Sequence, residues 1–189
     1  LASDAKIDSI YVYNCTVLPN APMNDPNYKK MMKIKTISSP IYLPHASIHD
    51  NESIPEIEQI ISETLSCDQD GLKQMFIHSW FIVTFHSLGL LEYVSKFYKK
   101  LYKIGFMDFY DSLLEFCQKE ESIFSKEYEI VRNYVDEGYA GKGWNHSDPK
   151  LGDIYWTIEE ASWLRSAYDK QKLKDSCVSF MRFLENKYK

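Results

Sequence analysis

The feature that most constrains the fold is a run from Met75 to Leu91 that is apolar on almost every side. A helix without a polar stripe is one that other parts of the protein surround. Beyond Gly89 the apolar residues recur on one face only, with lysines mainly elsewhere. The pattern therefore predicts a buried helix to about Leu88, a break at Gly89 and a half-exposed helix after it.

The ends of this region carry recognisable helix signals. Ser66-Cys67-Asp68-Gln69 has the pattern of a capping box, and Gly105 follows a lysine-rich turn as a glycine free to adopt a left-handed conformation. The apolar run falls short of the ~20 residues that cross a membrane, and it contains His78 and His86. We therefore expect no membrane-spanning segment.

Composition narrows the class of protein. The sequence has 189 residues, a formal net charge of −5 and 44% hydrophobic residues, enough for one domain with a sizeable core. An acidic balance argues against nucleic-acid binding, which needs a basic face. Because no targeting segment is recognisable, we expect a cytoplasmic protein. The first residue is Leu1 rather than methionine, so we expect a fragment of a longer protein.

The cysteines give no metal motif. Cys15, Cys67, Cys117 and Cys177 lie far apart and form no C-x₂-C pair, so the sequence predicts neither a zinc nor an iron–sulfur site. We expect reduced, mostly buried thiols.

The first part of the chain reads as a strand that runs into a proline-rich loop. Ile7 to Leu18 is rich in β-branched and aromatic residues, and three prolines follow between Pro19 and Pro26, which predicts a loop without regular structure. In α/β folds such loops at the strand carboxyl ends build sites. Pro19 and Asn20 are therefore candidate pocket residues.

Several segments resemble a known family in the right order. Tyr13 to Met23 (YNCTVLPNAPM), Asp25-Pro26-x-Tyr28 and Lys33-Ile34-Lys35-Thr36 are similar to the end of the barrel in cobalamin-dependent radical S-adenosylmethionine proteins, although Lys33 stands where that family has glycine. The resemblance continues through Glu58–Thr64, Trp80–Leu91, Phe106–Leu114 and Asp153–Leu164.

The resemblance implies a larger parent protein. Members of that family cleave S-adenosylmethionine with an iron–sulfur cluster, and cobalamin often assists. The C-x₃-C-x₂-C cluster motif is absent here, so we expect no cofactor within this chain and no activity from it alone. Its implied role is to close the barrel and shape the substrate pocket. Its implied partners are the N-terminal barrel and a cobalamin-binding domain of the same parent.

The resulting fold class is mainly α. We predict residues 1–65 as the end of the barrel with an extended connection, and 66–189 as a helical C-terminal domain of about five to six helices. Ile54 to Leu65 remains open, because its apolar spacing favours a helix and the resemblance favours a strand. The further helices are expected at Asp108–Gln118, at Ser122–Glu137 with Glu127 on a solvated face, after a capping box at Thr157, and from about Gln171.

Few residues are candidates for chemistry. His86 could face a cleft as a proton donor, base or axial metal ligand, but two space-filling histidines at 78 and 86 are the favoured alternative. His45 and His49 are a weak metal pair. The glycine-rich stretch 138–152 carries Trp144, Asn145 and His146, and it is a ligand-contacting loop, a surface loop pinned by its tryptophan, or disordered.

A different class of function stays open. The chain could be a free-standing helical ligand-binding or protein-interaction module, with His86 and aromatic residues lining a pocket. A cysteine triad in the upstream sequence would favour the radical S-adenosylmethionine assignment instead.

Overall fold

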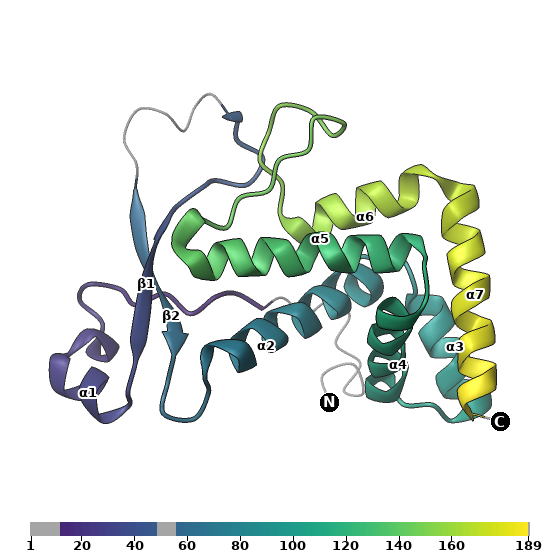
Figure 1. Cartoon of the computed structure of the whole chain (residues 1–189), viewed down its shortest axis with the longest axis horizontal. Coiled ribbons are helices and arrows are strands. Elements are labelled where there is room, and N and C mark those ends of the chain that lie inside the picture. The colour runs from purple at the N-terminus through teal and green to yellow at the C-terminus, as the bar shows by residue number, and fades with distance from the viewer. Residues whose placement is uncertain (1–11, 49–55, 189) are drawn as a thin grey trace. The chain divides into compact units, whose positions relative to one another are not determined.

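A computed structural model describes residues 12–48 and 56–188. Within these residues there are seven α-helices and a two-stranded sheet (Figure 1), which confirms a mainly helical fold that follows a β segment. Six of the helices lie in the predicted helical region. Residues 7–11 of the predicted strand, and His49, lie outside the described residues.

The chain forms two compact units. The sheet unit consists of residues 12–79 and 132–158, and the helical unit has 80–131 and 159–188 as its described residues. Helices α2 (Gln69–Phe81) and α5 (Ile123–Glu137) each begin in one unit and end in the other. The units do not follow the division at residue 65, which stays a prediction.

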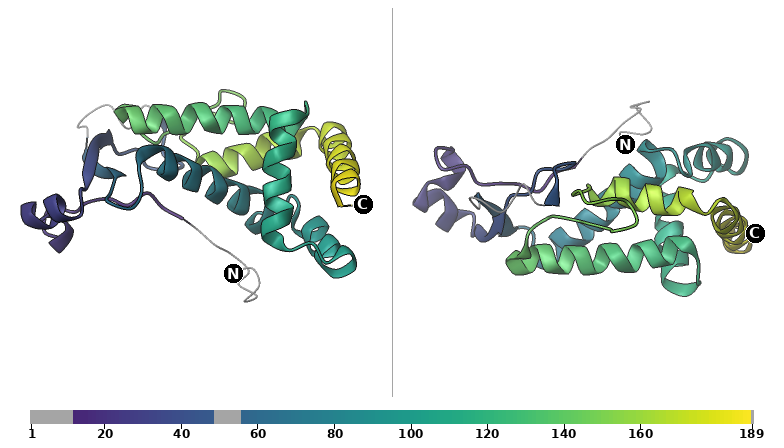
Figure 2. Two further views of the ribbon diagram at one scale, coloured as in Figure 1. Left: turned by 60° about the horizontal axis from the view of Figure 1, so that its bottom comes forward. Right: turned by 90° about the horizontal axis from the view of Figure 1, so that it is seen from above.

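The sheet unit is built around β1 (Lys35–Pro40) and β2 (Ile57–Glu63), which pair antiparallel and lie side by side in Figures 1 and 2. The other side of β2 is followed by residues 15–17: the Ile61 N–H donates to the Cys15 carbonyl at 2.9 Å. In the described part of 54–65 the strand alternative is correct for Ile57–Glu63, because pairing on both sides fixes it, whereas residues 54 and 55 lie outside the described residues.

The predicted strand at Ile7–Leu18 is wrong in its described part. Residues 12–18 contain an isolated bridge between Thr16 and Ile60 but no strand. The expectation of an irregular proline loop is also wrong. Pro22–Asn24 forms a 3₁₀ turn and Pro26–Met31 forms α1, because proline at a first helical position loses no hydrogen bond.

The cap of α2 is Asp68 and not Ser66. The Asp68 carboxylate accepts from the Gly71 N–H at 2.8 Å, and the helix begins at Gln69. Thr64 accounts for the shift, because its hydroxyl accepts the Cys67 N–H at 3.1 Å and holds the preceding residues in a turn.

The break at Gly89 is confirmed. After α2 a π-helical turn covers Ile82–Ser87, Gly89 has φ 90°, and α3 begins at Glu92 and ends at Tyr102. The left-handed residue beyond α3 is Lys103, with φ 60°, and not Gly105. Gly105 has φ −64° and ψ 160° because it immediately precedes the next helix.

The helical unit also contains α4 (Phe106–Lys119), α6 (Ile158–Tyr168) and α7 (Lys170–Tyr188). In Figures 1 and 2, α7 runs beside α3 and α4, and the Tyr98 hydroxyl donates to the Met181 carbonyl at 3.4 Å. The core is aromatic: Trp80 contacts Phe85 with ring centroids 5.5 Å apart, and its indole N–H donates to the Ser162 hydroxyl at 3.1 Å.

The apolar stripe of α5 is buried and consists of Phe124, Tyr128, Val131 and Val135, but the acidic face of the helix is not fully solvated. Glu127 is 3% exposed, because Arg165 binds it through Nε at 2.9 Å and Nη2 at 2.7 Å. The prediction that Glu127 faces solvent is therefore wrong. A charged side chain can be buried when a bidentate partner compensates the lost hydration.

No helix in the part of the chain that the structure describes is both long and apolar enough to span a membrane.

Candidate functional site

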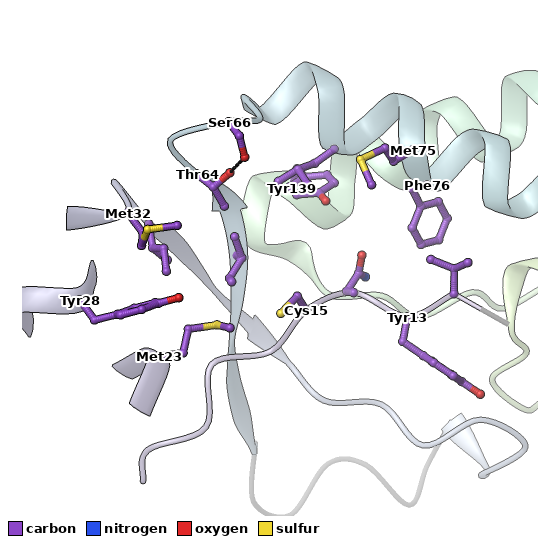
Figure 3. A pocket seen from close by; sticks show the side chains of 15 residues that line it. Tyr13, Cys15, Met23, Tyr28, Met32, Thr64, Ser66, Met75, Phe76 and Tyr139 are labelled. Carbon is purple, nitrogen blue, oxygen red and sulfur yellow. Dashed lines mark hydrogen bonds between the residues drawn. The ribbon is translucent and has the colours of Figure 1, made fainter. Parts of the chain in front are cut away.

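A pocket of about 370 Å³ lies in the sheet unit (Figure 3). Its lining comes from the extended residues at the start of the described chain, from α1, from the end of β2, from α2 and from the turn at Gly138–Lys142. These segments are distant in the sequence, so the pocket is a product of the fold of this unit.

Thioethers and aromatic rings form two opposing walls of the pocket. Figure 3 shows Met23, Tyr28 and Met32 on one side and Met75 with Tyr139 on the other. Methionine side chains are flexible and polarisable, and they adapt to irregular ligands. The remaining lining residues are Val12, Tyr13, Asn14, Cys15, Ile34, Ile61, Thr64, Ser66, Leu72 and Phe76.

None of the fifteen lining residues is an acid, a lysine, an arginine or a histidine. Polar contacts could come from the Asn14 amide and from the hydroxyls of Thr64 and Ser66, whose oxygens are 3.5 Å apart. Tyr13 is 83% exposed and Met75 is 60% exposed, so the pocket is open to solvent. The arrangement suits an uncharged, largely apolar group with a few hydrogen-bonding atoms.

Pro19 and Asn20 lie beside this region but do not line the pocket. Both are exposed, and the Pro19 carbonyl accepts the Asn24 side-chain amide at 2.9 Å. Met23, at the end of the same loop, is the residue that reaches the pocket. The assignment of Pro19 and Asn20 to a substrate or cofactor site stays a prediction.

Trp144 packs behind the pocket wall. Its ring centroid is 4.9 Å from that of Phe76 and 5.2 Å from that of Tyr139. A Cβ on Gly138 would come within 2.7 Å of the indole, so only glycine allows this approach. The Trp144 Nε1 is buried and has no hydrogen-bond partner among the described residues.

The neighbours of Trp144 are also ordered by the sheet unit. Asn145 is half-buried, and the His146 carbonyl accepts from the Trp156 N–H at 2.8 Å. The His146 ring lies 6.2 Å from that of Tyr134. These contacts support the alternative in which the tryptophan pins the loop, and contact with a ligand stays a prediction.

His86 belongs to the helical unit and has core surroundings. It is 5% exposed, its Nδ1 lies 2.9 Å from the Tyr110 hydroxyl, and its ring is 5.1 Å from Phe106. Burial lowers the pKa of His86, with the Glu92 carboxylate opposing this, so the neutral imidazole predominates at pH 7. These surroundings favour the space-filling alternative. His78 is exposed, with its Nδ1 2.8 Å from the Gln74 carbonyl.

The cysteines do not fit an iron–sulfur cluster. All four are free, and Cys117 alone is buried, so the expectation of mostly buried thiols is wrong. Burial raises the pKa of the Cys177 thiol to about 11 and that of Cys117 further, which disfavours the thiolate that binds metal. Among the described residues, no three His, Cys, Asp or Glu side chains converge on a metal position.

The His45 part of the weak metal pair has a structural role. Its ring packs edge-on to Trp156 with centroids 5.4 Å apart, and its backbone is left-handed with φ 65°. The described ring contact of His45 is thus with an aromatic side chain, and the metal pair stays a prediction because His49 lies outside the described residues.

Sequence reasoning missed most of the pocket. Met32, Met75 and Tyr139 carry no motif and come together only in the fold. The one available signal was the proline loop, where a site was expected and from which Met23 lines the pocket.

The chain is similar to two methyltransferases, of which one is a cobalamin-dependent radical SAM methyltransferase. No protein-family profile matches the chain. The similarity covers most of this chain, but the chain spans only about a quarter of the length of the curated relatives it matches.

Two relatives carry the comparison. The cobalamin-dependent radical SAM methyltransferase TokK of Streptomyces tokunonensis is 24% identical in an alignment 176 positions long, gaps included, that covers 86% of this chain and 26% of that protein. The 2-(S-pantetheinyl)-carbapenam-3-carboxylate methyltransferase of Streptantibioticus cattleyicolor is 24% identical in an alignment 191 positions long, gaps included, that covers 94% of this chain and 28% of that protein.

Proposed function

We propose that this chain is the C-terminal portion of a radical S-adenosylmethionine enzyme, of the cobalamin-dependent kind, and that it contributes a wall of the substrate pocket. The observation that carries the proposal is the similarity along most of the chain to two methyltransferases, one of them a cobalamin-dependent radical SAM enzyme, of whose lengths the chain spans about a quarter. Because the match covers only about a quarter of each relative, the comparison supports a part of an enzyme and not a whole enzyme.

The sheet unit supports a role in completing a larger sheet. Residues 15–17 pair with β2 through Cys15 and Val17, and the Val17 N–H donates to the Gln59 carbonyl at 2.7 Å. In an extended segment the backbone groups of the intervening residue, Thr16, point away from that partner. Within residues 12–48 and 56–188 these groups have no backbone partner, so a further strand from the upstream barrel could pair with them.

The pocket supports a role in holding substrate. It lies next to the proline loop, where the resemblance places the end of the barrel, and its lining is uncharged. S-adenosylmethionine carries a sulfonium, an ammonium and a carboxylate, so an uncharged pocket suits a neutral part of the substrate better. The cluster would be held by upstream residues, because this sequence has no C-x₃-C-x₂-C motif, and the resemblance assigns cobalamin to another domain of the parent protein.

The test uses the full-length protein and fills the pocket from one wall. We expect Met75→Trp to raise KM for the substrate by about tenfold or more, since lost pocket contacts act on binding. The iron content and the substrate-free cleavage of S-adenosylmethionine should stay unchanged. Met31→Trp is the matched control, because Met31 is 63% exposed and does not line the pocket.

Two results would contradict the proposal. The first is a full-length protein that retains its cluster and its turnover when residues 12–189 are removed. The second is an unchanged KM for Met75→Trp, which would place the substrate elsewhere while leaving the family relationship intact.

The second candidate is a free-standing helical binding module. It predicts that this chain binds its ligand or partner with undiminished affinity when no upstream polypeptide is present. The upstream sequence discriminates between the two, because a cysteine triad there belongs to the enzyme.

A further inference from the structure

Helix α3 leaves part of its apolar face uncovered. Tyr98 and Ser95 are buried in the helical unit, whereas Tyr93, Phe97 and Leu101 are 79%, 45% and 60% exposed. The three exposed residues are spaced by four, so their side chains follow one another along one side of the helix. We call these three residues the α3 stripe.

The aromatic part of the stripe is held in place by its neighbours. The Phe97 ring centroid is 5.6 Å from that of Tyr98 and 6.1 Å from that of Tyr102, and Tyr98 and Tyr102 stack at 5.1 Å. Tyr98 is anchored in the core, so the exposed rings are already ordered. Binding to ordered rings costs less conformational entropy, and such aromatic residues dominate the energetics of interfaces.

Lysines line one side of the stripe. Lys96, Lys100 and Lys103 are all exposed, although the whole sequence carries a net charge of −5. Lys96 pairs with Glu92 one turn earlier and lies 5.8 Å from the Tyr93 ring, while the Lys103 ammonium donates to the Lys100 carbonyl at 3.0 Å. The surface is thus locally basic on an acidic protein.

We propose that the α3 stripe, together with Lys96, Lys100 and Lys103, is a docking surface for an acidic amphipathic helix of a separate protein. A ridge of side chains spaced by four packs against a similar ridge on another helix, and carboxylates beside that ridge would meet the lysines. The surface is short, which suits a transient complex. This inference does not depend on the proposed enzymatic role.

The alternative occupant is an anionic lipid surface. Helices that lie on membranes carry a strongly polar face opposite the whole apolar face. In α3 the lysines flank the stripe on one side only, and the other side continues into Tyr98, which is 2% exposed. A partner helix, which contacts only the exposed part of the face, agrees better with this geometry.

The test measures binding of two labelled helical peptides to the intact chain. Both peptides have the same leucine ridge, and one carries glutamates where the other carries lysines. We expect the glutamate peptide to bind at least about tenfold more tightly, and Phe97→Ala with Leu101→Ala to weaken it by about tenfold or more. Lys96→Glu with Lys100→Glu should reverse the preference.

Matched controls come from exposed positions on neighbouring helices. Tyr168→Ala removes a side chain that is 90% exposed on α6, and Lys170→Glu reverses an exposed charge at the start of α7. Both should leave peptide binding unchanged. Circular dichroism of each variant checks the fold, and the charge reversals still test the proposal if the double alanine variant unfolds.

Several results would overturn the proposal. Equal binding of the two peptides, no binding of either, or undiminished binding by the variants would each do so. Vesicles of phosphatidylserine and phosphatidylcholine provide the lipid arm. If the chain sediments with them and the Phe97→Ala, Leu101→Ala variant does not, while the peptides fail to bind, the surface is a lipid contact.

Discussion

The two units differ in where their large apolar side chains lie. The α3 stripe is exposed outside the core of the helical unit, in which seven aromatic residues are almost fully buried: Trp80, Phe81, Phe85, Phe109, Phe116, Phe124 and Phe180. The sheet unit instead leaves Val12, Tyr13 and Met75 exposed around an uncharged pocket. Apolar surface that a chain does not cover marks a place where something else binds. We therefore expect the aromatic core of the helical unit to contribute most to stability, and the pocket of the sheet unit and the α3 stripe to contribute to binding.

The largest expected effect is a difference in the free energy of unfolding between alanine variants of two residues of α2. Trp80→Ala should lower the free energy of unfolding by about 3–5 kcal/mol, because it leaves a cavity and removes the partner of the Ser162 hydroxyl. Met75→Ala should change it by less than about 0.5 kcal/mol, because that side chain is 60% exposed. Urea denaturation of both variants measures the difference. Equal losses would show that the pocket wall is as much a part of the stable core as Trp80.

The second-largest expected effect is a loss of stability when the buried ion pair between Glu127 and Arg165 is broken. Glu127→Gln should cost about 3 kcal/mol, because it leaves the Arg165 guanidinium buried without its counter-charge. Glu121→Gln, at an exposed position, is the control and should be nearly neutral.

A double replacement separates the ion pair from the space it fills. Glu127→Leu combined with Arg165→Met should recover much of the lost stability, since apolar residues of similar volume can replace a buried pair. If the double variant is less stable than Glu127→Gln, the pair contributes more than the cost of its own desolvation.

The third effect compares a core histidine with an exposed one. Burial holds the pKa of His86 below its ordinary 6.5, so the unfolded chain takes up a proton that the folded chain resists. The free energy of unfolding should therefore fall as pH drops below about 6.5, by at most about 1.4 kcal/mol per pH unit. His86→Gln should make the free energy of unfolding depend less steeply on pH.

His78→Gln provides the control, because His78 is exposed on α2. Melting temperatures between about pH 7 and pH 5 measure both variants across the window in which histidine titrates. A slope that is unchanged in His86→Gln would mean that other groups cause the loss of stability in acid. A fall in turnover without a change in melting temperature would instead support a chemical role for His86.

The helices were predictable because their signals are local. Two helical patterns can be recognised from the spacing of apolar residues that are only a few positions apart. One is the apolar run that ends near Gly89, and the other is the buried stripe of α5 at Phe124, Tyr128 and Val131. The same local reasoning failed for Glu127, because the partner that allows its burial is Arg165, 38 residues further along the chain. A charged residue on a helix gives no sign of such a partner.

The candidate site was less predictable for the same reason. Its walls come from four or more segments, and Met32, Met75 and Tyr139 resemble ordinary core or surface residues until the fold brings them together. The strand at Ile57–Glu63 could not be separated from a helix by spacing, because its pairing with β1 and with residues 15–17 decides the outcome. The resemblance helped there because it carries information about the whole fold.

The smallest expected effect concerns Lys33, which stands where the similar family has glycine. After α1 the Ile34 N–H donates to the Lys29 carbonyl at 2.9 Å and the Lys33 N–H to the Lys30 carbonyl at 3.4 Å. This is a Schellman arrangement, and its left-handed position falls on Lys33, with φ 49°. A non-glycine residue pays about 1–2 kcal/mol for that conformation, while glycine costs about 0.4–1 kcal/mol in unfolded-chain entropy. We therefore expect Lys33→Gly to raise the free energy of unfolding by up to about 1 kcal/mol, measured by urea denaturation. Lys30→Gly, inside α1, should lower it by about 1 kcal/mol. If Lys33→Gly is destabilising, the lysine side chain contributes contacts of its own, and the backbone no longer explains why a glycine belongs at this point of the sheet unit.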